Sequence, residues 1–353
     1  MQALPDSQIL RGIMPPTILL IDVPSTDRAN WKGFLETHSY EVFTAGDGEA
    51  AQRQCLLLHP DVVLLRDTLP GIDGFELCRR LKENPLNQLV PIVLIQSSTH
   101  STDVERGRRA GDSDFWGTCT SIGEGLSRVQ SLLRLKNYID EQAKSVVLSL
   151  ARSIEAKDSL SERHSERMVQ YAVQLGHSLG FEEQELEELQ IACLLHDVGK
   201  VAVPHGILMK PGPLNEDELE IVKRHPITGE NICAPVKLLR SILPLIRHHH
   251  ERVDGSGYPD GLCGEHIPMR ARVLQIADIY DALITERPYR VALSSREALE
   301  ILDREAQHGW LDTSLVRRFS RLRQANQCHR GRGGSILASF CNILRLPKNV
   351  VFS

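Results

Sequence analysis

Five short apolar runs, separated by amphipathic segments, determine the fold expected for the first third of the chain. The runs occupy residues 18–21, 41–45, 61–65, 91–95 and 114–116, and each intervening segment can form a helix. Strands that alternate with helices in this way form a parallel sheet that helices cover on both faces. We therefore expect an α/β domain with a five-stranded parallel sheet at residues 17–124, after an N-terminal tail at 1–16.

A long stretch without glycine or proline follows the last run. From residue 126 to 157 apolar residues recur at helical spacing, which predicts a linker helix over 125–157 about 50 Å long. The stripe is close to a heptad repeat, so it favours a homodimeric coiled coil, with packing onto the following domain as the alternative. The members of the stripe are Leu126, Val129, Leu132, Leu133, Ile139, Val146, Leu150 and Ile154.

The remaining sequence is predicted to be almost entirely helical. Helical periodicity covers residues 163–179, 182–195, 216–225, 236–250, 268–285 and 294–306, and proline or glycine separates these segments. The chain is therefore expected to be multidomain, with an all-α domain at 158–324. Residues 325–353 combine a Gly/Arg run with a short apolar patch, and we assign this C-terminal tail no function.

Histidine and aspartate gather in the helical half. Three consecutive histidines, His248 to His250, precede a glycine-rich turn in IRHHHERVDGSGYP, and further histidines occur in SERHSERM, LLHDVGK and VKRHPITG. A lone histidine of this kind is most often a core residue. The adjacent His196 and Asp197, however, end a buried helix, where neither group is readily buried without a partner. Imidazole with carboxylate suits a divalent first-row metal, and the lack of cysteine in these motifs argues against a closed structural zinc site.

Composition restricts the class of protein. The net charge of −5 argues against a surface that coats nucleic acid, so an anionic substrate must meet local positive charge. No stretch approaches the ~20 apolar residues that span a bilayer, and the N-terminus lacks a secretory signal pattern. The eight cysteines include no CxxC pair, which is typical of reduced thiols. We therefore expect a cytoplasmic protein without a membrane or nucleic-acid partner.

About half of the chain, residues 158–323, resembles the HD-GYP domain, a bacterial phosphodiesterase of the HD superfamily that cleaves cyclic di-GMP. The resemblance rests on HDVGK, KRHPITGENI, RHHHERVDGSGYPDGL, IPMRARVLQIADIYDAL and RPYR, which occur in the family's order. Val253 departs from the family, which usually has tryptophan there. Leu160 occupies the position of a glutamate that binds a third metal in some members, so the resemblance implies two metal ions.

The resemblance also implies the roles of individual residues. Asp197 would bridge two ions, with iron or manganese expected first and zinc, nickel or cobalt as alternatives. Asp197 and Lys200 would be the catalytic residues, and Arg287 and Arg290 would join Lys200 in contacting the substrate. Asp281 would be either a hydrogen-bond acceptor for a ligand histidine or a helix-stabilising residue. The implied metal ligands are His164, His196, Asp197, His225, His249, His250 and Asp278.

The resemblance implies hydrolysis of cyclic di-GMP. Two cations would activate water and stabilise the charge that develops at phosphorus. The product would be pGpG, with further cleavage to GMP left open. Two other functions stay open: an HD-type phosphohydrolase acting on another nucleotide, and a non-catalytic adaptor that binds proteins with GGDEF domains. The GYP loop and RPYR favour the first function over a plain HD hydrolase, and the complete ligand set argues against the adaptor.

The first domain resembles a response-regulator receiver, a flavodoxin-like α/β fold, through its five runs and PDVVLLRDTLPGIDGFELCRRLK. An active receiver needs two neighbouring acids, an acceptor aspartate, a hydroxyl and a lysine. Here Asp22 keeps one acid, but the other four positions hold Val23, Arg66, Gln96 and Thr118. Arginine at the acceptor position would also repel a magnesium ion. We therefore expect a pseudo-receiver, and it stays open whether Arg66 pairs with Asp22 or the domain is a plain scaffold.

Overall fold

The computed structural model describes residues 15–21, 25–96, 102–117, 121–157, 164–286 and 291–330. The chain forms two compact units. The first comprises Met1–Lys157 together with Asp197–Ile246, and the second comprises Asp158–His196 together with Arg247–Ser353. The neighbouring residues His196 and Asp197 therefore mark a point where the chain passes from one unit to the other.

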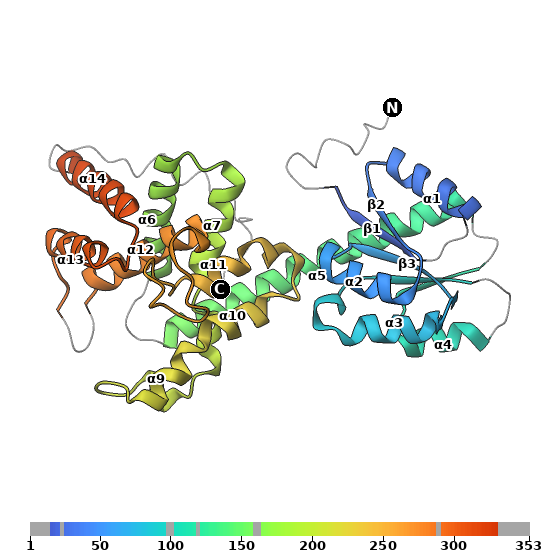
Figure 1. The fold of residues 1–353 in the computed structure, drawn as a ribbon, viewed down its shortest axis with the longest axis horizontal. Helices are drawn as coiled ribbons and strands as arrows, with labels where there is room; N and C mark the ends of the chain where they lie inside the picture. The colour runs from blue at the N-terminus through green and yellow to red at the C-terminus, as the bar shows by residue number, and fades with distance from the viewer. Residues whose placement is uncertain are drawn as a thin grey trace, which may run out of the picture. The chain divides into compact units, whose positions relative to one another are not determined.

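A five-stranded sheet forms the centre of the first unit (Figure 1). Its spatial order is β2-β1-β3-β6-β7, and every neighbouring pair is parallel. This is the doubly wound order of flavodoxin-like domains, so the predicted fold is confirmed. The strands are β1 (Thr17–Ile21), β2 (Glu41–Ala45), β3 (Val62–Arg66), β6 (Ile92–Ile95) and β7 (Asp114–Trp116), while β4 (Thr68–Leu69) and β5 (Ile72–Asp73) form a separate antiparallel pair.

Helices cover both faces of this sheet, which explains why its strands are apolar on both sides. Leu19 and Leu65 point into a core shared with α2, α3 and α4, whereas Ile18 and Leu64 point into a core shared with α1 and α5. The alternation follows from the two-residue period of a strand. The elements around the sheet are α1 (Ser25–Thr37), α2 (Gly48–Leu58), α3 (Gly74–Glu83), η2 (Pro85–Asn87), α4 (Thr102–Ala110) and α5 (Ile122–Lys157).

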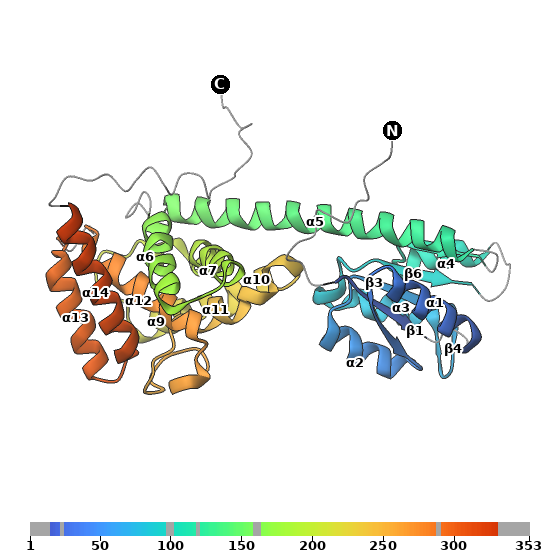
Figure 2. The same cartoon turned by 90° about the horizontal axis from the view of Figure 1, so that it is seen from above.

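Helix α5 is a single helix of 36 residues, close to the predicted linker helix (Figure 2). Part of its apolar stripe, however, is covered by the chain's own fold. Val129 and Leu133 lie in the core on the α1 side of the sheet, with exposed fractions of 0% and 7%. The first part of the stripe thus packs on the preceding domain, which neither of the two sequence-based alternatives anticipated. Farther along α5, Tyr138 and Val146 are exposed, at 63% and 67%.

Short helices make up the rest of the first unit. The prediction of one helix over 236–250 is wrong, because a 3₁₀ helix precedes a separate α-helix whose first turn contains Pro244, which has no N–H for a continuous ladder. Gly199 allows η3 and α10 to pack closely, since a Cβ atom there would lie 1.9 Å from the carbonyl oxygen of His225. These elements are η3 (Val198–Ala202), α8 (His205–Leu208), α9 (Glu216–Lys223), α10 (His225–Cys233), η4 (Lys237–Ile242) and α11 (Leu243–His248).

Polar contacts connect η4 to the α/β domain within the first unit, at the residue before β3 and at η2. Lys237 pairs with Asp61, a buried carboxylate that also accepts a hydrogen bond from the backbone N–H of Thr17 at 2.8 Å. Arg240 donates from Nη2 to the carbonyl oxygen of Leu86 at 2.7 Å. A cation at each of these two contacts therefore holds η4 in place.

Helix α12 is the central helix of the second unit (Figure 1). It packs against α6, α7, α13 and α14, and Tyr280 on α12 meets Tyr171 and Phe319 with ring centroids 5.1 and 5.0 Å away. None of the described helices has the length and apolar character needed to cross a membrane. The elements are α6 (His164–Leu179), α7 (Glu183–Leu195), η5 (Gly264–His266), α12 (Met269–Ile284), α13 (Ser295–Gln307) and α14 (Thr313–Arg330).

Candidate metal centre

The end of helix α7 carries two neighbouring candidate ligands. His196 is the C-cap residue of α7 and is 2% exposed, and Asp197 follows it. His196 Nδ1 lies 2.9 Å from the carbonyl oxygen of Cys193. Because a carbonyl oxygen only accepts hydrogen bonds, Nδ1 carries the proton and Nε2 carries the lone pair. The helix end therefore sets the tautomer that a metal ligand needs.

Three elements of the second unit bring imidazole and carboxylate together. His164 begins α6, His196 caps α7 and Asp278 lies on α12. Their candidate ligand atoms all lie within 4.8 Å of one another, and His164 Nε2 is 3.5 Å from Asp278 Oδ1. Two imidazole nitrogens and a carboxylate oxygen form a donor set that suits a divalent first-row metal. The arrangement fits the metal that the sequence predicts for these residues.

Asp281 orients one of these histidines. Its Oδ2 lies 2.6 Å from His164 Nδ1, and Arg167 donates two hydrogen bonds to the same fully buried carboxylate. Burial alone would raise the pKa of Asp281, but the bonds from His164 and Arg167 hold it below its usual range. Of the two roles left open for Asp281, the structure supports the hydrogen-bond acceptor.

The two carboxylates around His164 also change its protonation. Burial would lower the pKa of this imidazole, but Asp278 and Asp281 more than offset that effect and raise it to about 10. Without a metal the imidazole is therefore protonated at neutral pH. A metal ion that binds at His164 Nε2 must displace this proton, as metal binding to a histidine generally does.

The first unit holds a second imidazole–carboxylate pair. His225, at the start of α10, places Nε2 3.2 Å from Asp197 Oδ1. Its Nδ1 lies 2.7 Å from the carbonyl oxygen of Val222, so His225 has the same tautomer as His196. Lys200 Nζ lies 2.6 Å from the other oxygen, Asp197 Oδ2. Asp197 thus faces an imidazole with one oxygen and an ammonium group with the other.

The histidine triplet begins at the last residue of α11 and divides into two parts. His249 is fully buried, and its ring centroid lies 4.0 Å from that of His250 and 5.2 Å from that of His196. Nitrogen atoms of His249 and His250 come within 4.8 Å of each other. His248 instead faces two carboxylates, with Nδ1 3.4 Å from Asp260 and 3.9 Å from Glu251. The metal ligands that the family resemblance implies include His249 and His250 but not His248.

Two segments of the chain match known domain families. Residues 18–117 match the response regulator receiver domain, and residues 149–315 match the HD domain. Over 310 residues the chain is 34% identical to the cyclic di-GMP phosphodiesterase response regulator RpfG of Xanthomonas campestris pv. campestris, a match that covers 81% of this chain and 82% of the relative. The chain belongs to the family of receiver–HD response regulators.

Two further relatives resemble this receiver–HD response regulator to different extents. A cyclic di-GMP phosphodiesterase of Thermotoga maritima is 29% identical over 321 residues, which cover 81% of this chain and 85% of the relative. The 3'3'-cGAMP-specific phosphodiesterase 1 of Vibrio cholerae is 34% identical over 175 residues, which cover 50% of this chain and 41% of the relative. The match to the Thermotoga protein spans both domains of the regulator. The match to the Vibrio protein covers only half of the regulator.

Two of the predicted receiver positions of the regulator, Arg66 and Gln96, lie in the described part of the chain. Arg66 is the last residue of β3 and pairs in register with Ile95. Gln96 follows β6 and is 8% exposed, and Asp67 is buried beside the strand end. Six other positions named in the sequence analysis lie outside the described part of the chain. They are Asp22, Val23, Thr118, Leu160, Arg287 and Arg290.

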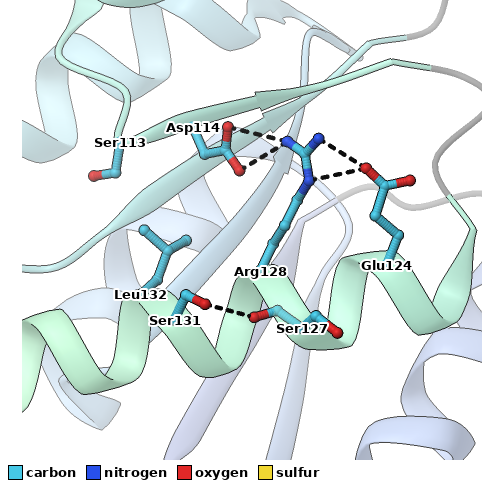
Figure 3. Close-up of a pocket in the computed structure, with 7 residues that line it drawn as sticks. All are labelled: Ser113, Asp114, Glu124, Ser127, Arg128, Ser131 and Leu132. Atoms are coloured by element: carbon cyan, nitrogen blue, oxygen red, sulfur yellow. Dashed lines mark hydrogen bonds and ion pairs between the residues drawn. The ribbon is translucent and has the colours of Figure 1, made fainter.

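A shallow pocket of the regulator lies between β7 and α5, and none of the residues that line it is a predicted site residue. Figure 3 shows Arg128 between Asp114 and Glu124, at 3.2 and 2.8 Å from their carboxylate oxygens. Both acids are therefore paired with the guanidinium. The seven residues that line the pocket include no imidazole or thiol, so we do not assign it a catalytic role.

Sequence reasoning missed two residues around the site. Arg167 lies three positions after His164, so both face Asp281 from one side of α6, but an arginine on a helix surface gives no signal by itself. Glu251 follows the histidine triplet directly and is fully buried. A charged residue shortly before a glycine-rich turn is usually assigned to the surface, so its burial was not evident from the sequence.

Proposed function

We propose that this receiver–HD response regulator hydrolyses cyclic di-GMP to pGpG. The observation that carries the proposal is the His164, His196 and Asp278 group, which offers metal-ligand chemistry at the end of α7. It occurs in a chain that shares 34% identity with a relative named for cyclic di-GMP phosphodiesterase activity, over 82% of that relative. It stays open whether the same site then cleaves pGpG to GMP.

We infer that the site holds two divalent ions, because nitrogen and oxygen donors suit first-row metals. The family resemblance favours iron or manganese, with zinc, nickel or cobalt as alternatives. One ion would bind His164, His196 and Asp278. The other would bind His225, His249 and His250, and Asp197, the neighbour of His196, would bridge the two. When bound, such ions lower the pKa of water and stabilise negative charge at phosphorus. The supporting observation is the imidazole–carboxylate pairing found in each unit.

The chain's own cations would bind the phosphates. Lys200 Nζ lies next to Asp197, so an ammonium group is held beside the proposed bridging carboxylate. We propose that Lys200 donates a charge-assisted hydrogen bond to a phosphate oxygen of the substrate, together with Arg287 and Arg290. This supplies positive charge locally in a chain whose net charge is −5.

We propose further that the receiver domain does not accept phosphate. Support comes from Arg66 at the end of β3 and from Gln96 after β6, because neither side chain is an acceptor carboxylate or a sensing hydroxyl. A guanidinium at the strand end also disfavours a magnesium ion. Arg66 would take the place of that cation.

A homodimer through α5 is a separate proposal. Since Val129 and Leu133 are buried within the chain, a dimer contact would use exposed apolar side chains such as Tyr138 and Val146 instead. Light scattering of Val146→Glu against the wild type tests this contact. A role as an adaptor for GGDEF-domain proteins is less well supported, because the residue types that ligate metal are all present.

Another cyclic dinucleotide is the second candidate substrate, since a relative named for 3'3'-cGAMP matches half of the chain. The test is turnover of cyclic di-GMP and of 3'3'-cGAMP by the full-length protein, purified anaerobically and loaded with iron or manganese. Faster turnover of cyclic di-GMP supports the first proposal, and faster turnover of 3'3'-cGAMP supports the second. No turnover of either compound would contradict both.

A further inference from the structure

We propose that Glu251 is a positioning residue that fastens the loop 254–262 beside His250. Glu251 belongs to a third group of ligand-type side chains, with His248 and Asp260, whose atoms also lie within 4.8 Å of one another. Such a group could be taken for another metal site. The hydrogen bonds in and around it assign it instead to holding the loop.

Both oxygens of the Glu251 carboxylate are bonded to the loop. Oε1 accepts a hydrogen bond from the backbone N–H of Asp260 at 2.7 Å, and Oε2 accepts one from the backbone N–H of Leu262 at 3.0 Å. The side chain is fully buried. A buried carboxylate is costly unless donors compensate it, and here the loop backbone supplies those donors.

Asp260 is engaged in a way that competes with a metal ion. Arg247 donates to both of its oxygens, at 2.6 and 2.8 Å, in the bidentate geometry that guanidinium and carboxylate prefer. The Arg247 charge also lowers the pKa of Asp260, so the carboxylate is ionised at neutral pH. A cation placed among His248, Glu251 and Asp260 would have to displace Arg247 and two backbone donors.

The backbone under the loop is fixed as well. Gln275, on α12, donates to the carbonyl oxygen of Glu251 at 2.6 Å. Gly257 passes so close to this backbone that a Cβ atom there would lie 2.3 Å from the nitrogen of Arg252 and 2.5 Å from the Cα of Glu251. The loop therefore has two anchors, the Glu251 carboxylate and the close approach at Gly257.

The loop 254–262 places Tyr258 against His250. The backbone N–H of Tyr258 donates to the carbonyl oxygen of His250 at 3.3 Å, and the two rings stack with centroids 4.8 Å apart and an interplanar angle of 30°. An aromatic ring in this place restricts the orientation of the imidazole. The functional consequence rests on the proposed role of His250 as a metal ligand, whereas the fastening of the loop does not.

The test compares Glu251→Gln with the wild type in the full-length, manganese-loaded protein. Glutamine keeps the size of the side chain but offers one oxygen acceptor, so one loop N–H faces an amide NH₂ group. We expect hydrogen exchange at the amide of Asp260 or Leu262 to become roughly 10- to 100-fold faster. This factor corresponds to the loss of one hydrogen bond to a charged group. The manganese content should stay at the wild-type value, and kcat/KM for cyclic di-GMP should fall. Glu265→Gln, an exposed neighbour, is the matched control and should change none of these.

Three results would overturn the proposal. Wild-type exchange at both amides would show that Glu251 does not hold the loop, whatever the activity. Loss of manganese, with or without faster exchange, would identify Glu251 as a ligand. Faster exchange and intact manganese with wild-type kcat/KM would show that the fastening does not serve the site. If the wild type itself does not cleave cyclic di-GMP, the proposed function fails while the exchange and metal results still decide the role of Glu251.

Gly257→Ala loosens the same loop without touching the carboxylate and keeps the proposal testable if Glu251→Gln does not fold. The added methyl group must push the loop away from the backbone at residues 251 and 252. We expect faster exchange at the amides of Asp260 and Leu262, with the manganese content unchanged. Unchanged exchange in this variant would contradict the close packing on which the proposal depends.

Discussion

Strand β3 and helix α7 each end beside two neighbouring residues that carry ionisable side chains, and the chemistry at the two ends differs. Strand β3 ends at Arg66, followed by the buried Asp67, whereas α7 is capped by His196, followed by Asp197. A guanidinium has only donors and keeps its charge, so it cannot ligate a cation, while neutral imidazole and carboxylate both offer lone pairs. The two ends therefore differ in whether their side chains can ligate a cation.

The largest expected contrast is between Asp278, a proposed metal ligand on α12 that lies next to His196, and Arg66 at the end of β3. Asp278→Ala should lower cyclic di-GMP turnover by more than about 100-fold. Substitution of a residue that only hydrogen-bonds to a metal ligand already lowers metal affinity or activity by about 10- to 100-fold. Arg66→Ala should leave turnover and metal content at the wild-type values. Steady-state kinetics and elemental analysis of both variants measure the contrast, and equal effects would contradict it.

Lys200 tests whether the cation next to Asp197 serves the substrate. Lys200→Ala should leave the metal content unchanged and reduce kcat/KM roughly 10- to 150-fold, which corresponds to the loss of a charge-assisted hydrogen bond of about 1.5–3 kcal/mol. Lys223→Ala, which removes a lysine paired with Glu220 on α9, is the control. Wild-type kinetics for Lys200→Ala would show that Lys200 does not contact the substrate and only forms an ion pair with Asp197.

Asp281 tests whether the orientation of a ligand histidine affects metal binding at the end of α7. Asp281→Asn keeps the shape of the side chain but weakens its bonds to His164 and Arg167. The affinity for manganese should fall by about 10- to 100-fold, as is typical of residues that orient metal-ligating histidines. Calorimetric titration measures it, with Asp303→Asn as an exposed control. An unchanged affinity would show that Asp281 only stabilises the fold.

The smallest effect is expected at the receiver. Acetyl phosphate or beryllofluoride should change neither the activity nor the mass of the protein, because arginine instead of aspartate occupies the acceptor position at the end of β3. Restoring the acceptor in Arg66→Asp should not restore phosphorylation, since Gln96 still occupies the position of the sensing hydroxyl. Intact-mass spectrometry tests this, and a stable phosphoryl adduct on Asp67 or Asp22 would contradict the pseudo-receiver.

Sequence patterns predicted the elements that depend on local periodicity. The five strands and the long helix lie close to where apolar spacing placed them, because alternation and helical repeats are directly visible in sequence. The prediction for 236–250 was wrong, since the effect of Pro244 at a helix start was overlooked. The covered face of α5 could not be predicted either, because burial of Val129 depends on a sheet that forms from distant residues.

For the site, the residue types predicted metal ligation, whereas the hydrogen-bond partners of those residues are known only from the structure. His196 and Asp197 indicated a metal from their type and their place at a helix end. The bonds from Asp281 to His164 and from Glu251 to the loop backbone join residues whose distance in space the sequence does not reveal. Such contacts depend on how the segments pack together.

The metal content of the wild type and of Asp197→Ala, measured with cyclic di-GMP turnover on the same anaerobically purified samples, tests the central claim most directly. The proposed site predicts two ions per chain and turnover in the wild type, and loss of both in Asp197→Ala, because the substitution removes a ligand from each ion and leaves their repulsion uncompensated. Asp197→Ala protein that keeps its metal and its turnover would contradict the claim that the residues at the end of α7 form the catalytic metal centre.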